Sequence, residues 1–197
     1  MESGFPEIQA RHTRIVLEAL GALFPAAVPR VRERLSPLVL QAIDAAFRLD
    51  YLPVMVELEV IASIREELGP KGSRQVAREG LRRSLESNLL SGLVSSAIVL
   101  FGNTPSGLLK WVGRGYGRVC RDCGELRLED AGEAHAEVRL VNLPRELNVP
   151  SYLDAVGGAL EAFFDVCQVK GEVQHDPWPG GARYLLRWTP RSTTPAG

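Results

Sequence analysis

The sequence predicts an α+β fold, in which an N-terminal helical bundle precedes an antiparallel sheet with one packed helix. Over residues 1–112 the apolar residues recur at three- and four-residue spacing, which is typical of amphipathic helices. Over residues 113–189 the pattern changes to alternation between turn residues, which is typical of strands. A run of helices followed by a run of strands favours segregated helices and an antiparallel sheet, here in the order β-β-β-α-β-β.

Capping and helix-breaking residues place the helix boundaries. Ser36-Pro37 matches an N-cap followed by a first-turn proline. The Gly69-Pro70 pair stops a helix, because proline cannot continue it. The expected helices of the first half span residues 8–23, 38–49, 51–68, 73–87, 89–101 and 106–112.

The clearest strand lies at residues 134–141. Ala134, Ala136, Val138 and Leu140 share one face there, whereas mostly polar residues share the other. The other expected elements of the second half are strands at 114–121, 124–129, 166–175 and 182–188, and a helix at 150–164.

The chain of 197 residues fits one domain of ordinary size. It contains no internal repeat and no low-complexity linker. We therefore expect a single domain over residues 1–189, with its helical part at 1–112 and its sheet part at 113–189. Residues 190–197 are expected to form a flexible tail.

Composition limits the class of partner and the setting. With 23 basic and 24 acidic residues the formal net charge is −1, which argues against a nucleic-acid partner. Three cysteines and the lack of a signal peptide favour a cytoplasmic protein with free thiols. The most apolar stretch, residues 89–101, is shorter than the roughly 20 residues of a spanning helix, so we expect a buried core helix and no membrane span.

Several short stretches, taken in order, match the layout of known families. They lie at residues 68–70, 102, 108–111, 138–144, 152–153, 157–162 and 184–188.

In that order of elements the chain resembles an uncharacterised paralogous family of myxobacteria. Its layout is also similar to the 4-vinyl reductase domains, the haem–nitric-oxide-binding domains and the TRAPP-type trafficking subunits. The resemblance implies a ligand-binding or assembly domain, commonly dimeric, and carries over no catalytic residue. Haem-binding relatives use a histidine inside a helix and a Tyr-x-Ser-x-Arg motif. Here His12 is the only histidine in an expected helix and the motif is absent, so we expect no cofactor.

Four residues are candidates for lining a ligand pocket. Glu57 lies in an apolar helical run, where a buried carboxylate needs a partner or a pocket. Ser91 and Ser95 put small side chains on one side of the most apolar helix, which either allows close packing or leaves room for an apolar ligand. Trp111 closes the helical half and is the fourth candidate.

Arg74, Arg78 and Arg82 recur every four residues and therefore share one helix face. This face is either solvated or a surface for an acidic partner or an anion.

The Cys120-x-x-Cys123 pair is the sharpest local motif. Two such thiolates can hold a metal ion such as zinc or form a redox pair, and the third alternative is an ordinary turn with free thiols. His12, His135 and His175 are expected at the surface, and no Gly-x-Ser-x-Gly elbow marks a nucleophile.

These observations favour a non-catalytic ligand-binding or protein-interaction domain with a signalling role, expected to be a homodimer. The alternatives are a metal or redox protein that uses Cys120 and Cys123, and a structural subunit of a larger assembly. No enzyme activity is expected. Zinc or a small apolar ligand is compatible with the sequence, whereas no resident cofactor is expected.

Overall fold

A computed structural model describes residues 5–47, 49–86 and 90–190 and confirms the α+β fold with antiparallel sheets. Apart from Pro190, the expected C-terminal tail lies outside the described residues. The helices are α1 (Ala10–Leu23), α2 (Val28–Arg34), α3 (Pro37–Ala45), α4 (Val54–Glu86), α5 (Ser91–Phe101), α6 (Pro105–Leu109), α7 (Val112–Val119) and α8 (Pro150–Val166), with 3₁₀ turns at Pro25–Ala27 and Arg145–Leu147.

Two of the predicted helix boundaries are confirmed by their local geometry. The Ser36 hydroxyl accepts a hydrogen bond from the Val39 amide at 3.4 Å and so caps α3. At Gly69 the backbone turns to a φ of 70°, which kinks α4 where the sequence predicts a break between two helices.

The main sheet has four antiparallel strands in the order β4-β5-β7-β6, and a small three-stranded sheet has the order β2-β1-β3. In β5, Ala136, Val138 and Leu140 are buried as the alternation predicts. The strands are β1 (Glu7–Gln9), β2 (Tyr51–Pro53), β3 (Cys120–Arg121), β4 (Glu125–Ala131), β5 (His135–Val141), β6 (Gly171–Trp178) and β7 (Gly181–Trp188).

The strand predicted at 114–121 is wrong over most of its length, because these residues form α7. The glycines at 113, 115 and 117 have no strong preference of their own, so packing decides their conformation. A side chain at Gly113 would lie 2.6 Å from the carbonyl oxygen of Leu126, so this glycine lets α7 approach β4 closely. Only Cys120–Arg121 is extended, and it pairs with β1.

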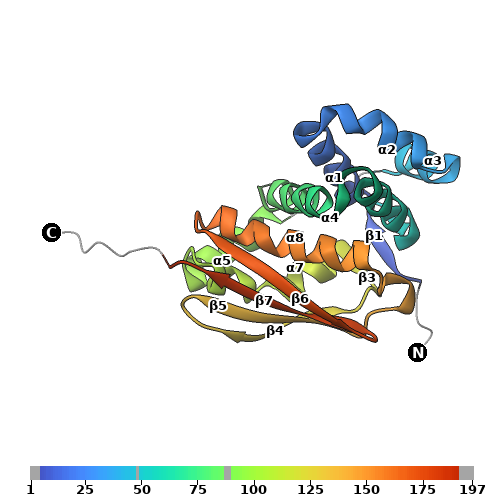
Figure 1. Cartoon of the computed structure of the whole chain (residues 1–197). Coiled ribbons are helices and arrows are strands. Elements are labelled where there is room, and N and C mark those ends of the chain that lie inside the picture. Colours follow the sequence, from blue (N-terminus) through green and yellow to red (C-terminus); the bar gives the residue numbers. More distant parts are fainter. Residues whose placement is uncertain (1–4, 48, 87–89, 191–197) are drawn as a thin grey trace.

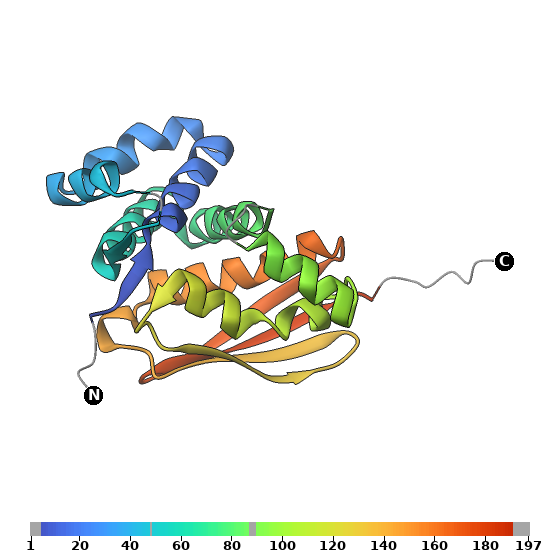
Figure 2. The ribbon, with the colours of Figure 1, turned by 180° about the vertical axis from the view of Figure 1, so that it is seen from behind.

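The elements form layers (Figures 1 and 2). One face of the four-stranded sheet is covered by α8 together with α5 and α7, α4 lies over α8, and α1 to α3 lie farthest from the sheet. The buried apolar side chains form two clusters, one between the sheet and its helices and one among α1 to α4. Since α4 contributes to both, it joins the helical part to the sheet part.

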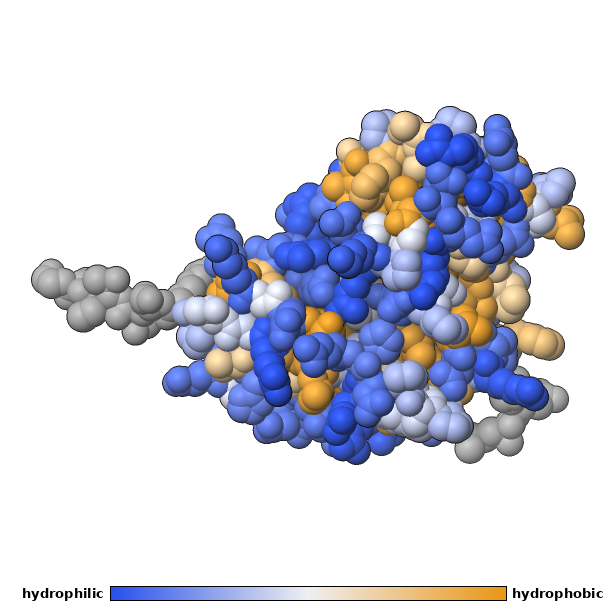
Figure 3. Space-filling model, in the orientation of Figure 1, coloured by the Kyte–Doolittle hydropathy of each residue, from blue (hydrophilic) through white to orange (hydrophobic). Residues whose placement is uncertain are grey.

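The expectation that residues 89–101 form a buried core helix is wrong, because Leu90 and Ala97 are the only buried residues among those whose burial the structure describes there. Val99 and Leu100 are 83% and 64% exposed, whereas Ala97 is buried. Helix α5 lies at the outer edge of the layer, so only one side of it can face the core. Within the described residues, no helix combines the length and the apolar character needed to cross a membrane. The face in Figure 3 is mainly hydrophilic, with apolar side chains in separate patches.

The contact between α4 and α8 generates a first prediction. A methyl group at Gly158 would overlap the backbone carbonyl of Arg74, which cannot move without shifting α4. We expect Gly158→Ala to lower the free energy of unfolding by about 1–3 kcal/mol, measured by urea denaturation. The control is Gly92→Ala on exposed α5, where nothing lies within 4 Å of the new methyl group and stability should stay level or rise. Equal effects at both positions would contradict the close packing.

Candidate functional site

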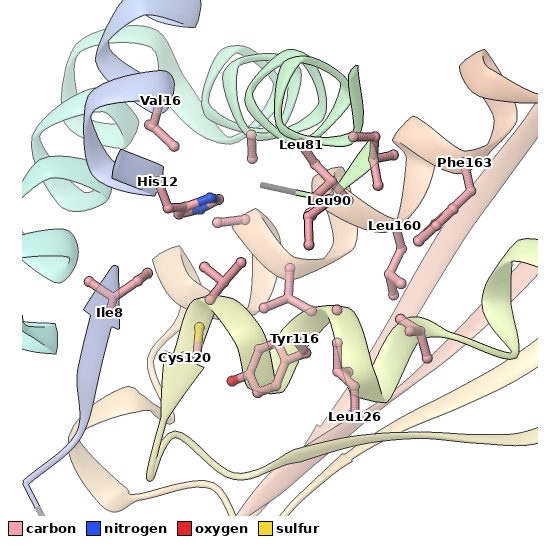
Figure 4. Close-up of a pocket in the computed structure, with 18 of the residues that line it drawn as sticks. Ile8, His12, Val16, Leu81, Leu90, Tyr116, Cys120, Leu126, Leu160 and Phe163 are labelled. Atoms are coloured by element: carbon pink, nitrogen blue, oxygen red, sulfur yellow. The ribbon is translucent and has the colours of Figure 1, made fainter. Parts of the chain in front are cut away.

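An interior cavity of about 140 Å³ lies where the two clusters meet. Its walls are mostly apolar and come from α1, α4, α5, α6, α7 and α8 and from β1, β3 and β4. Figure 4 shows side chains from these elements converging on one space. Apolar lining residues include Ile8, Val16, Leu81, Leu90, Leu160 and Phe163.

Several polar side chains interrupt this apolar wall, among them His12 of α1 and Glu57 of α4. The His12 ring points into the cavity (Figure 4), and its Nε2 lies 3.9 Å from Oε1 of Glu57. That separation is longer than a hydrogen bond. The Glu57 side chain is only 4% exposed, and neither its Oε2 nor the His12 Nδ1 has a hydrogen-bond partner within the described residues.

The far wall holds a group of buried hydroxyls and thiols. The hydroxyl oxygens of Tyr116 and Tyr152 lie 2.7 Å apart, and Tyr116 also donates to the carbonyl oxygen of Cys123 at 2.8 Å. Burial raises the pKa of both tyrosines well above the usual value. The Cys120 pKa is also raised, first by its hydrogen bond to Cys123 and then by burial. Tyr116, Tyr152 and Cys120 are therefore neutral at physiological pH.

The four sequence-predicted pocket residues separate into two pairs. Glu57 and Trp111 line the cavity, and the part they play in binding stays a prediction. Ser91 and Ser95 do not line it, because the side of α5 that carries them is half-buried at Ser91 and exposed at Ser95. The structure therefore does not place Ser91 and Ser95 at this cavity.

The prediction that His12 lies on the surface is wrong. Its side chain is only 18% exposed and lines the cavity. The sequence does contain an indication that His12 is buried. His12 lies one helical turn before Val16, which belongs to the apolar stripe of α1, so both side chains share one face of the helix.

The predicted partner surface at Arg74, Arg78 and Arg82 is wrong as a free basic face. Arg74 donates to Glu161 of α8 at 2.8 Å, Arg78 binds Asp165 with two nitrogens, and Arg82 pairs with Glu79 and Glu86 of its own helix. Intramolecular carboxylates thus neutralise these cations. The hydrophilic band over α4 and α8 in Figure 3 is an ion-pair network that joins two helices.

The structure brings Cys120 and Cys123 together without making a metal centre. Within the described ranges, no group of three His, Cys, Asp or Glu side chains is arranged to hold a metal ion. Cys123 instead donates to the carbonyl oxygens of Arg121 and Glu7, at 3.1 and 3.4 Å. Cys120, Cys123 and Cys167 are all buried.

Comparison with known proteins identifies the fold. No protein-family model and no curated protein matches the chain, so the likeness to a myxobacterial family has no sequence support. Solved structures do match, and H-NOX proteins are among them. A mutant of the K. algicida H-NOX protein in its Fe(II) unliganded form has a TM-score of 0.65 at 8% identity, over 94% of this chain and 98% of that one. A mutant of T. tengcongensis H-NOX has a TM-score of 0.61 at 15% identity, over 94% and 100%.

The expectation that no cofactor is involved is corrected by this likeness. One matching structure is described as probing the function of heme distortion in the H-NOX family, at 16% identity, a TM-score of 0.61 and 96% coverage of this chain. The architecture found here therefore houses haem in solved proteins. The missing Tyr-x-Ser-x-Arg motif is not a sufficient reason to predict a domain without a cofactor.

The residues of the cavity can be tested against haem directly. Histidine, cysteine and tyrosine are all side chains that ligate haem iron, and His12, Cys120 and Tyr116 line the cavity. Two requirements are not met. The volume of 140 Å³ is below the roughly 300–1,000 Å³ of pockets for larger ligands, and among the described lining residues there is no arginine or lysine to pair with propionates. The cavity as it stands does not fit haem.

The network beside the cavity makes stability depend on pH through His175. Burial, followed by the charges of Arg74 and Arg65, lowers the pKa of His175 from 6.5. The folded protein therefore favours neutral His175, whereas the unfolded chain takes up its proton near pH 6.5. We expect stability to fall as the pH drops from about 6.5 through the folded-state pKa.

His175→Gln should flatten this part of the profile, measured by urea denaturation between about pH 7.5 and 5. Gln174→Ala is the control, because Gln174 is an exposed residue of the same strand and carries no titratable group, so this change should leave the slope unchanged. An unaltered slope in His175→Gln would refute the assignment.

Proposed function

We propose that this chain is a non-catalytic ligand-binding domain with a signalling role, and that the ligand occupies the interior cavity. The observation that carries the proposal is an apolar cavity whose wall contains unpartnered buried polar atoms. A buried polar group without a partner costs free energy. The wall contains three such atoms among the described residues, namely His12 Nδ1, Glu57 Oε2 and Trp111 Nε1, so it favours a bound molecule that supplies partners. The H-NOX fold supports the proposal, because in solved proteins this architecture is built around a bound group.

A signalling role follows from the elements that the ligand would touch. The lining joins α1 of the outer helical part to α7 and α8, which pack on the sheet. A ligand that prefers one spacing of these helices shifts the population towards it. The response can then reach the surface through α5, whose Ala97 lines the cavity while Val99 and Leu100 are exposed.

The first experiment is native mass spectrometry of the protein purified from its own host. We expect extra mass from one bound organic molecule per chain, and the same spectrum reports whether the chain is a homodimer. Protein that carries no bound mass and also fails to bind toluene in solution would refute the ligand-binding proposal.

A cavity-filling variant locates the ligand. Ala77 of α4 lines the cavity, so Ala77→Leu should occupy the space and abolish the bound mass while the protein stays folded by circular dichroism. Ala45→Leu is the control, since Ala45 is an exposed residue of α3 and should retain the ligand. Equal loss in both variants, or in neither, would move the ligand out of the cavity.

A further inference from the structure

Glu57 places a buried carboxylate at one end of the cavity. It projects from α4, and its side chain is almost fully buried, with an exposure of 4%. Oε2 has no hydrogen-bond partner among the described residues, and Oε1 faces the imidazole of His12 at 3.9 Å. A buried carboxylate is stabilised by a close donor, preferably a charged one.

Glu59, on the other side of α4, is a carboxylate with hydrogen-bond partners and serves as a comparison for Glu57. Glu59 accepts hydrogen bonds from both the amide and the hydroxyl of Ser36. Glu57 and Glu59 are two residues apart and therefore point about 200° apart around the helix. Glu59 is thus used in joining α4 to the start of α3, whereas Glu57 is left facing the cavity.

The remaining polar atoms of the wall decide the sign of a complementary ligand. No arginine or lysine is found among the described residues that line the cavity. Tyr116, Tyr152 and Cys120 are neutral, because burial and their neighbours raise the pKa of each. An anionic ligand would therefore meet Glu57 without a compensating cation, whereas a cation would be paired by it.

His12 adds a second acceptor to this end. A neutral imidazole has one nitrogen that accepts a hydrogen bond, and Nδ1 is buried without a partner among the described residues. An ammonium group has three N–H donors, so it can serve both the Glu57 carboxylate and this ring nitrogen. A hydroxyl has one donor and can serve only one of them.

The volume sets the size of the apolar part. An apolar cavity of about 150 Å³ is known to hold benzene, and the cavity here measures about 140 Å³. The rest of the lining is mostly apolar, and its indole N–H at Trp111 is a donor without a partner among the described residues, so it offers nothing to a second ammonium group.

We propose that the cavity binds a small apolar amine, with its ammonium group against Glu57 and His12 and its hydrocarbon part among the apolar side chains. This inference rests on the proposed ligand-binding function and names the chemical class that the site selects.

Isothermal titration calorimetry with four probes of similar size tests it on the unmodified protein. The probes are benzylamine, benzyl alcohol, benzoate and toluene, each at the same mildly alkaline pH. We expect benzylamine to bind at least about tenfold more tightly than toluene, since a hydrogen bond to a charged group is stronger than a neutral one. Benzoate should bind most weakly of the four.

Two variants of α4 assign the preference to one side chain. Glu57→Gln should reduce the advantage of benzylamine over toluene to less than about threefold while toluene binding persists, because the charged partner is lost. Glu59→Gln should keep the full advantage, because Glu59 faces Ser36. If Glu57→Gln fails to fold, the relative affinities of benzylamine and benzoate for the unmodified protein still test whether the cavity prefers an amine.

The possible results distinguish amine binding from the more general ligand-binding function. Toluene binding with no advantage for benzylamine, or tighter binding of benzoate, overturns the amine assignment and leaves the ligand-binding function standing. Haem that co-purifies with the chain also supports the function and overturns the amine assignment, because haem brings two carboxylates. Binding of none of the probes to a protein that carries no bound mass overturns both.

Discussion

The close contact between α4 and α8 is the constraint on which the rest of the structure depends. Gly157 and Gly158 remove two side chains from α8, so the backbone of α4 at Arg74 can lie against it. From there Arg74 reaches Glu161 on α8 and the carbonyl oxygen of Val173 on β6. One side chain therefore connects the helical part, the packed helix and the sheet. Charge-assisted hydrogen bonds of this kind are stronger than neutral ones, so the junction is held firmly.

The cavity is a consequence of the same arrangement. Where α4 and α8 are held by glycines and ion pairs they pack tightly, and beyond that contact the helices enclose a space that the described side chains do not fill. Protein interiors are close-packed, so an unfilled apolar space of this size costs dispersion energy. The buried Glu57 carboxylate at one end of this space adds an electrostatic cost, because its Oε2 has no hydrogen-bond partner among the described residues.

The likeness to H-NOX proteins and the chemistry of the cavity answer different questions. A TM-score of 0.65 at 8% identity describes a shared path of the backbone and leaves the side chains of the pocket free to differ. The cavity of this chain lies among helices that follow this path. The side chains that line it decide the size and charge of what enters, and here they provide a small apolar space with one carboxylate.

The sequence by itself determined the fold class and most of the elements, because these follow from local physics. Some structural features depend only on residues close together in the sequence, so they can be predicted from it. Examples are the Ser36 cap, the helix break at Gly69 and the alternation of buried residues in β5. The glycine-rich helix α7 was predicted as a strand, because its residues have little local conformational preference. Packing against β4 decided its conformation instead.

Tertiary structure alone decided which side chains form the site. Arg74 and Arg78 lie 87 residues from their carboxylate partners, so a face that looks free along the helix is neutralised in the fold. His12 and Glu57 meet only because α1 and α4 pack together, and neither spacing nor composition records that contact. Periodicity tells which face of an element is apolar, whereas the partner of each face depends on how distant segments are brought together.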